Sequence, residues 1–313
     1  MIGIDVGGAN LKVVDTDGSV HIHYCPLWEK APVTALLEPY ARQHTEPAAV
    51  VMSGELADSF HNKAQGIAFI VGAVRRAFPR ARFYGMDGRF HDRAVPDLAA
   101  ANWLASADYL RGRYPDAILL DIGSTTADII PLGRFPDLIG LSDLDRLQRG
   151  FLVYTGMLRT SIPTILQDVI LEGRRTRVST EYFAASADAH LVLGTITAAQ
   201  YLCDTPDHKE KTREASLRRL ARVVCADLEE TGEDGAMEIA RQFWALQRTM
   251  IAGAVRTCMD SCGSGRLIVA GIGAPLFARE LNGTDLTELL GPGADALPAL
   301  AVREIALRDT LFS

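Results

Sequence analysis

The amino-acid sequence predicts an α/β fold of two related halves, each a mixed sheet flanked by helices, around a central cleft. Strand-like and helix-like segments alternate along the chain, which is typical of α/β proteins. The phrase DVGGANLKVVDT, which begins at Asp5, is nearly repeated as DIGSTTADIIPL from Asp121. Each copy starts a new series of strands. With 313 residues, the chain is long enough for two domains of ordinary size.

Composition excludes several classes of protein. Hydrophobic residues make up 48% of the chain and charged residues 23%, as in globular proteins. The net charge of -7 argues against nucleic-acid binding. The chain does not begin like a signal peptide, its longest apolar run is too short to cross a bilayer, and its five scattered cysteines form no disulfide framework. We expect a cytoplasmic protein without nucleic-acid or membrane partners; a homodimer is left open.

The first half is predicted to cover residues 1–115. Three short strands, MIGIDV, LKVV and VHIHY, come first, joined by the turn GGAN and by a hairpin at Asp17-Gly18. Helices are then expected over 33–42 and 65–78, strands over 48–54 and 82–86, and one further helix from 96 to 110. A strand meander followed by strand-helix crossovers predicts a mixed sheet.

The second half is predicted to cover residues 116–313 and to contain an inserted segment. It opens with the strands of DAILLDIGSTTADIIPL. A strand pair around TILQDVIL and TRVST, helices over 184–193 and 217–229, and a long helix over 237–259 are expected next. The run RLIVAGIGAPLFAREL reads as strand, glycine turn and helix. The last helix is a candidate for packing back on the first half.

Glycine turns after buried strands predict a phosphate site. Their backbone N–H groups are unscreened by side chains, and neighbouring hydroxyls add hydrogen-bond donors. An aspartate at the end of the preceding strand would hold a magnesium ion that bridges to the phosphate. The phosphate-binding candidates are Gly7, Gly8, Asn10, Gly123, Ser124, Thr125, Thr126, Gly271 and Gly273, and the metal candidates are Asp5, Asp121 and Asp128. The alternative for any one such turn is an ordinary hairpin.

Other phosphate and hydrolase motifs are absent from the sequence. No Walker A string occurs, and the GIG turn lacks the third glycine of a Rossmann fingerprint because Leu276 stands there. No metalloprotease or serine-hydrolase motif occurs either.

The three glycine turns, in this order, resemble the phosphate and adenosine motifs of the actin, hexokinase and heat-shock ATPase superfamily, which implies a duplicated actin-like ATPase (ribonuclease H-like) fold. Within it, MSGELADSFHNKAQGI, DIGSTTADIIPL and LVYTGMLRTSIP are similar to the hydantoinase A and oxoprolinase-like group. AANWLASA, FAASADAHLVLG and CDTPD resemble its small stand-alone branch, found in methanogens and in methylotrophic bacteria with tetrahydromethanopterin-linked C1 transfer.

This resemblance implies a magnesium-dependent transferase of methanofuran-type cofactor biosynthesis with a small phosphorylated substrate. The implied reaction joins an aminomethylfuran-methyl diphosphate to the phenol oxygen of gamma-glutamyltyramine and releases diphosphate. ATP-using members of the superfamily usually carry Thr or Ser where this chain has Ala9, so ATP is left open but not favoured. The alternative is an ATP-dependent hydrolase of the hydantoinase kind or a small-molecule kinase.

The candidate catalytic residues are Asp121, Glu55, Asp188 and Lys12. Glu55 and Asp188 lie in stretches that carry the resemblance and are candidates for the base that deprotonates the phenol; a structural hydrogen-bonding role is the alternative for both. Lys12 is a candidate for stabilising the leaving diphosphate, with an exposed strand position as the alternative. Lys63 is a further candidate for binding the diphosphate, or else a solvated residue near a helix N-terminus.

Overall fold

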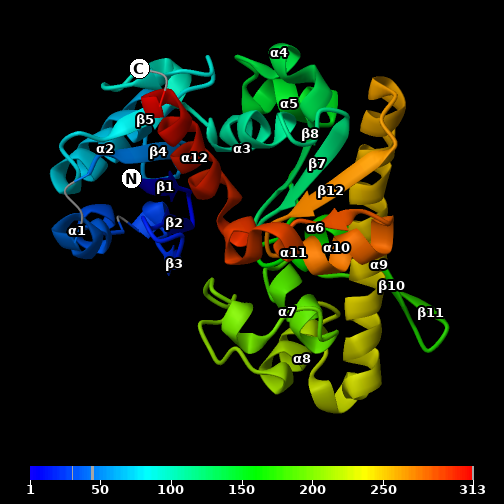
Figure 1. Cartoon of the computed structure of the whole chain (residues 1–313). Helices are drawn as coiled ribbons and strands as arrows, with labels where there is room; N and C mark the ends of the chain where they lie inside the picture. The colour runs from blue at the N-terminus through cyan, green and yellow to red at the C-terminus, as the bar shows by residue number, and fades with distance from the viewer. Residues whose placement is uncertain (30, 44–45, 312–313) are drawn as a thin grey trace.

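The computed structural model describes residues 1–29, 31–43 and 46–311 and contains two mixed sheets with matching topology (Figure 1). The strand order is β3-β2-β1-β4-β5-β6 in the first sheet and β9-β8-β7-β12-β13 in the second. In the first sheet, β1 pairs antiparallel with β2 on one side and parallel with β4 on the other. In the second sheet, β7 likewise pairs antiparallel with β8 and parallel with β12. The register also matches, with Asp5 opposite Lys12 and Asp121 opposite Asp128. The predicted α/β fold with two related sheets is confirmed.

The strands of the first sheet are β1 (Ile2–Val6), β2 (Asn10–Val14), β3 (Val20–Tyr24), β4 (Ala48–Met52), β5 (Arg82–Tyr84) and β6 (Phe90–His91). Those of the second are β7 (Ala117–Ile122), β8 (Ala127–Pro131), β9 (Leu152–Val153), β12 (Arg266–Ala270) and β13 (Thr284–Asp285). The strands β1, β4 and β7 are almost continuously apolar because helices cover both of their faces.

Among the described residues, four helices enclose the first sheet. On one face, α1 (Val33–Gln43) and α2 (Lys63–Ala77) share a core with β1 and β4, in which Leu37 and Ile70 are fully buried. On the other face, α3 (Asn102–Arg111) and α12 (Leu297–Leu311) pack against Val51 of β4 through Leu104 and Val302. The C-terminal helix of the chain therefore covers the N-terminal sheet.

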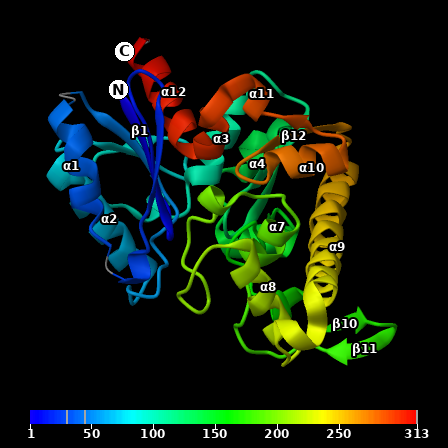
Figure 2. The same ribbon diagram turned by 90° about the horizontal axis from the view of Figure 1, so that it is seen from below.

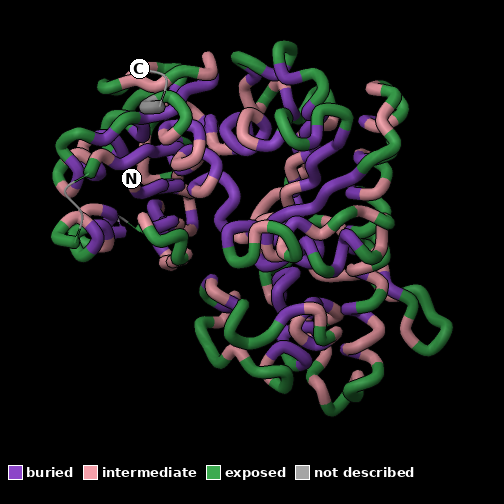
Figure 3. Tube along the Cα trace, viewed as in Figure 1, coloured by how far each residue is buried: buried purple, intermediate pink, exposed green. Residues whose placement is uncertain are grey.

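The same core continues into the second sheet. Leu119, Ile130 and Ile268 join the cluster that contains α3 and α12, together with the short helix α4 (Phe135–Leu138). Both views of the chain show α3 and α12 between the sheets (Figures 1 and 2), and the central strands β1, β4, β7 and β12 are buried along most of their length (Figure 3). This shared core fixes the position of β1 relative to β7.

Helices α9 (Leu228–Cys262) and α10 (Ala274–Leu281) cover the far face of the second sheet, where Val255 and Phe277 pack on Leu120 and Val269. A separate core lies around Phe243 of α9, in the part of the chain that was predicted to be an insertion and that we call the inserted segment. Its elements are α6 (Ile162–Ile165), β10 (Asp168–Leu171), β11 (Arg174–Arg177), α7 (Ser186–Val192) and α8 (Arg213–Arg222). The β10–β11 hairpin projects from this part of the molecule (Figure 2). The remaining helices are α5 (Asp143–Arg149) and α11 (Thr287–Leu290).

Three helices differ from the sequence prediction; one of them, the long helix expected over 237–259, is α9 and begins at Leu228. The helix expected over 96–110 is a single 3-10 turn at Pro96–Leu98 followed by α3, because Ala100 adopts a left-handed conformation with φ of 50°. The helix expected over 217–229 ends at Arg222, and Asp227 caps the start of α9 by accepting from the Glu230 N–H. Within the described part of the chain, no helix is long and apolar enough to span a membrane.

Candidate active site

A cavity of about 210 Å³ lies where the glycine turn after β1 meets the glycine turn after β7. Asp5 and Asp121, at the ends of β1 and β7, both line it. Asn10 Nδ2 approaches Ser124 Oγ to 3.4 Å and so links the two turns directly. The other predicted residues on the cavity wall are Gly7, Gly8, Lys12, Gly123, Thr125, Thr126 and Asp128. The two copies of the motif thus converge on one space.

The two turns have the same internal geometry. The Gly7 N–H donates to the Asn10 carbonyl oxygen, and the Gly123 N–H donates to the Thr126 carbonyl oxygen, both at 2.9 Å. A carbonyl oxygen in each turn also accepts a hydrogen bond from a neighbouring segment. The Leu27 N–H donates to the Gly8 carbonyl oxygen at 2.9 Å, and the Leu158 N–H donates to the Ser124 carbonyl oxygen at 3.0 Å. With their carbonyl groups held this way, the turns are suited to offer N–H groups to an anion in the cavity.

The segment 155–160 braces the second turn. A Cβ added at Gly156 would lie 2.6 Å from the Thr125 nitrogen and 2.7 Å from the Gly123 oxygen. Gln247 of α9 holds the segment by donating Nε2 to Thr155 Oγ1 and to the Gly156 carbonyl oxygen, both at 2.9 Å. His190 Nε2 donates to Gln247 Oε1 at 2.9 Å, and burial lowers the pKa of His190 to about 4, so the ring is neutral. His190 therefore orients Gln247 from within the protein interior.

Gly156→Ala is expected to displace the second turn. The new methyl group would overlap backbone atoms that cannot rotate away, which should cost about 1–3 kcal/mol of stability. Turnover should fall about tenfold to a hundredfold because the turn would no longer lie correctly at the reacting groups. Thermal unfolding and steady-state kinetics measure the two effects. Gly112→Ala is the matched control, since nothing lies within 4 Å of its added Cβ and its φ is -68°.

The carboxylates in the cavity have unusual electrostatics. Burial raises the pKa of Asp5 to about 6, while the charge of Lys12 lowers it. Burial also raises the pKa of Asp121 to about 7; Lys12 opposes this shift, and Asp128 and Asp5 add to it. Asp5 Oδ1 is buried and has no hydrogen-bond partner among the described residues. Two partly uncompensated carboxylates on one cavity form a site that favours a cation.

Asp128 has a different environment. Arg146 of α5 is almost fully buried and forms ion pairs with Asp128 and, at 2.9 Å, with Asp143. Burial raises the pKa of Asp128, and the Arg146 charge and hydrogen bond lower it. Lys12 donates Nζ to the Asp295 carbonyl oxygen at 2.8 Å, which holds the ammonium group beside the three aspartates. No group of three or more acidic, His or Cys side chains in the described residues is arranged as a preformed metal site.

Several predicted residues lie off the cavity wall. Asp188 is fully buried in the inserted segment and is ion-paired with Arg219. Lys63 is the first residue of α2, whose N-terminus Asn62 caps by accepting from the Gln65 N–H at 3.0 Å. Glu55 is 2% exposed, and burial raises its pKa. The structure therefore does not bring these three side chains together with Asp5 and Asp121.

The third glycine turn also lies off the cavity wall. The N–H of Gly271 donates to the Ala294 carbonyl oxygen and that of Gly273 to the Ile122 carbonyl oxygen, both at 3.2 Å. Gly271 has a φ of 83°, and an added Cβ would lie 2.6 Å from Asp121 Oδ1. These glycines allow the β12–α10 turn to pack closely against the end of β7.

Sequence reasoning did not select Asp143, Arg146 or Arg159, which also line the cavity. Arg159 stands in LVYTGMLRTSIP, a stretch that carries the family resemblance, so a positive charge there was a usable signal. Asp143 and Arg146 carry no local signal, because they read as the first turns of an ordinary amphipathic helix.

The matched sheets, with a phosphate-type turn from each, define a protein of the duplicated actin-like ATPase fold. Similar solved structures include a ROK family glucokinase from Streptomyces griseus in complex with glucose and AMPPNP (13% identity, 97% of this chain and 98% of that one, TM-score 0.42). Another is the archaeal actin homolog Ta0583 (14% identity, 98% and 99%, TM-score 0.44).

The chain belongs to the hydantoinase/oxoprolinase family, whose profile matches residues 46–302. A curated relative from Methanocaldococcus jannaschii is 34% identical over 97% of both chains and is named (4-{4-[2-(gamma-L-glutamylamino)ethyl]phenoxymethyl}furan-2-yl)methanamine synthase. A Methanococcus vannielii protein of the same name is 34% identical over 53% of this chain and 75% of its own length.

Proposed function

We propose that this chain is a methanofuran-pathway transferase. It joins the methylene carbon of an aminomethylfuran-methyl diphosphate to the phenol oxygen of gamma-glutamyltyramine or a similar tyramine acceptor. The bond from that carbon to the diphosphate oxygen breaks, an ether bond forms, and the phenol proton leaves to a base. The observation that carries the proposal is the convergence of two matched aspartate-and-glycine turns on one cavity, in a chain similar over 97% of its length to a synthase of this name.

Magnesium fits the residues at this cavity. The ion prefers oxygen ligands and is usually held by one or two carboxylates together with substrate phosphates and water, so a three-carboxylate cluster is not required. Asp5, with its orphaned buried oxygen, and Asp121 would hold it, while Asp128 is committed to Arg146. When bound, the ion would neutralise charge that develops on the leaving diphosphate.

The side chains of this site divide the remaining work. The turns that begin at Gly7 and Gly123 bind the diphosphate oxygens through N–H groups and the hydroxyls of Ser124 and Thr125. Lys12, fixed by the Asp295 carbonyl group, lies beside the aspartates and supplies positive charge to the leaving group. The furan ring shares positive charge at the methylene carbon, so stabilisation of the leaving group carries most of the rate acceleration.

The base for the phenol is assigned by position. Glu55 is the better of the two candidate carboxylates. Burial raises its pKa, and Asp143 and the Ala100 backbone, both on the cavity wall, lie near enough to act on it as well, whereas Asp188 is held by Arg219 within the inserted segment. A buried carboxylate with a raised pKa is suited to accept a proton from a phenol, whose pKa is about 10 in water. Glu55→Gln should then lower kcat with little change in substrate binding.

The proposal is tested by incubating the purified protein with the furan diphosphate, gamma-glutamyltyramine and magnesium. Mass spectrometry should detect the ether product in equal amount to released diphosphate. Turnover of ATP with magnesium, without ether formation, would instead identify a hydrolase or kinase of the hydantoinase kind. The third glycine turn, with Gly271 and Gly273, lies off the wall of the cavity that both aspartates line, which favours the first outcome.

A further inference from the structure

Arg159 is held at the cavity from three sides. Its backbone N–H donates to the Ser124 carbonyl oxygen at 3.0 Å, and its Nη1 lies 3.4 Å from Thr125 Oγ1. The face of its guanidinium group stacks on Trp28, 4.4 Å from the ring centroid. Trp28 belongs to the first half and Thr125 to the second, so the guanidinium group spans the junction between the two halves. A stacked guanidinium group is oriented in advance for hydrogen bonding along its edge.

The charges on the cavity wall single out this arginine. Four carboxylates, Asp5, Asp121, Asp128 and Asp143, face three cationic side chains. Arg146 is bound to two of the carboxylates, and Lys12 lies beside the others with its Nζ on a carbonyl group. Among the described residues, no carboxylate forms an ion pair with Arg159. Its donors are therefore available to an anion that enters the cavity.

We infer that Arg159 binds the diphosphate of the donor substrate, and that Trp28 positions the Arg159 guanidinium group for this contact by stacking on it. This inference rests on the proposed function. A guanidinium group offers two parallel N–H donors that match phosphate oxygens, and its contact with Thr125 places these donors at the second glycine turn. Because that turn follows directly from Asp121, the anion bound there is the diphosphate and not the glutamyl carboxylate of the acceptor.

Titration calorimetry with inorganic diphosphate and magnesium tests the assignment. Arg159→Met, which keeps an unbranched apolar side chain and removes the charge, should weaken diphosphate binding about tenfold or more, and Arg159→Lys should recover part of it. Arg266→Met is the matched control, because Arg266 also stacks on an aromatic ring, 4.8 Å from the centroid of Tyr114, but does not line the cavity. It should bind diphosphate like the parent protein, with a thermal midpoint similar to that of Arg159→Met.

Kinetics then separate the two substrates. Arg159→Met should raise the KM for the furan diphosphate about tenfold and leave the KM for the phenolic acceptor within about twofold. Equal diphosphate affinity in parent and variant, or a raised KM for the acceptor alone, would overturn the assignment. If the parent protein binds diphosphate but makes no ether, the proposed function fails, while the calorimetric comparison still decides the role of Arg159.

Discussion

Asp121→Asn is expected to reduce kcat/KM about a thousandfold, equivalent to ~4 kcal/mol of transition-state stabilisation. The amide is a weak ligand for magnesium, so the variant loses both the ion and its effect on the leaving diphosphate. Asp5→Asn should act in the same direction, since the two carboxylates line one cavity. Steady-state assays at saturating magnesium measure the loss. Asp137→Asn, an exposed aspartate paired with Arg134 outside this cavity, is the control.

Asp121→Asn is expected to lower activity but to raise stability, so the loss of activity can be distinguished from misfolding. Folding raises the pKa of Asp121 from 3.8 to about 7, so the folded state binds this proton more tightly than the unfolded state. The contribution of Asp121 to the free energy of unfolding therefore falls as pH rises from about 4 to about 7. Asparagine does not titrate, so the thermal midpoint of the metal-free variant should exceed that of the parent more at about pH 8 than at about pH 5. A difference in thermal midpoint between variant and parent that is the same at both pH values would contradict the raised pKa of Asp121.

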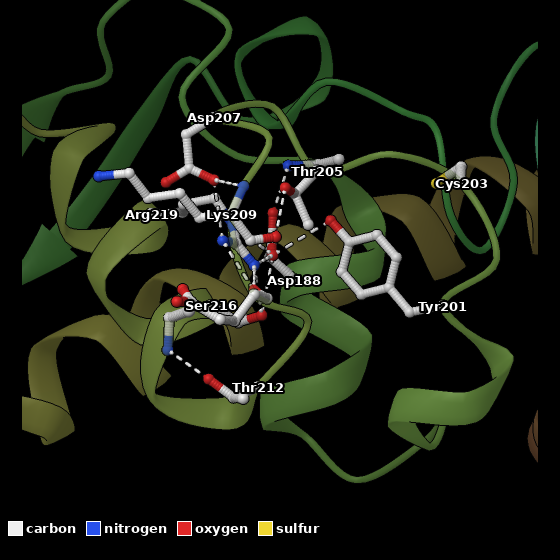
Figure 4. A network of polar contacts seen from close by, with 12 residues as sticks. Asp188, Tyr201, Cys203, Thr205, Asp207, Lys209, Thr212, Ser216 and Arg219 are labelled. Carbon is white, nitrogen blue, oxygen red and sulfur yellow. Dashed lines mark hydrogen bonds and ion pairs between the residues drawn. The ribbon is translucent and has the colours of Figure 1, made fainter.

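Asp188→Ala is expected to destabilise the inserted segment by about 3–5 kcal/mol. Figure 4 shows the network around this carboxylate: Asp188 accepts from Arg219 Nε and Ser216 Oγ, both at 2.8 Å, and from the Tyr201 hydroxyl at 3.3 Å. Both members of the Asp188–Arg219 pair have fully buried side chains. Removing one partner leaves the other charged and without its counterion in the protein interior.

A double-mutant cycle tests this role. Arg219→Met alone should also destabilise, whereas Asp188→Ala combined with Arg219→Met should recover part of the stability because no unpaired charge remains. Glu214→Ala breaks an exposed pair with Arg218 in the same helix and should cost less than about 1 kcal/mol. Chemical denaturation gives the energies. If Asp188→Asn were fully stable but inactive, Asp188 would have to be restored as a candidate base.

The parts of the site that were predictable are those encoded by local sequence. A strand, a glycine turn and a second strand are contiguous, so Asp5, Gly7, Asp121 and Gly123 could be placed from spacing alone, and their repetition predicted a shared cavity. Arg146 could not be placed this way. It reaches Asp128 across 18 residues, and only the packing of α5 beside β8 and β9 brings the two together.

The elements of the fold also divide into those that local sequence predicts and those that depend on contacts with distant segments. The order of strands and helices followed from hydrophobic periodicity, and the Asp17-Gly18 turn between β2 and β3 followed from its sequence. The break before α3 did not, because alanine rarely adopts the left-handed conformation that Ala100 has here. Likewise, the glycines at Gly271 and Gly273 have the composition of a phosphate turn, but the hydrogen bonds that occupy their N–H groups come from distant segments.

The position of α12 has a consequence for biosynthesis of the protein. Leu297, Ala301 and Val302 close the face of the first sheet that carries Ala49 and Val51. A ribosome makes these helical residues almost 250 positions after the strand that they cover, judging from their numbers in the chain. Until then the nascent N-terminal half carries an open apolar face, so it completes its folding late in translation and depends on protection from aggregation while it waits.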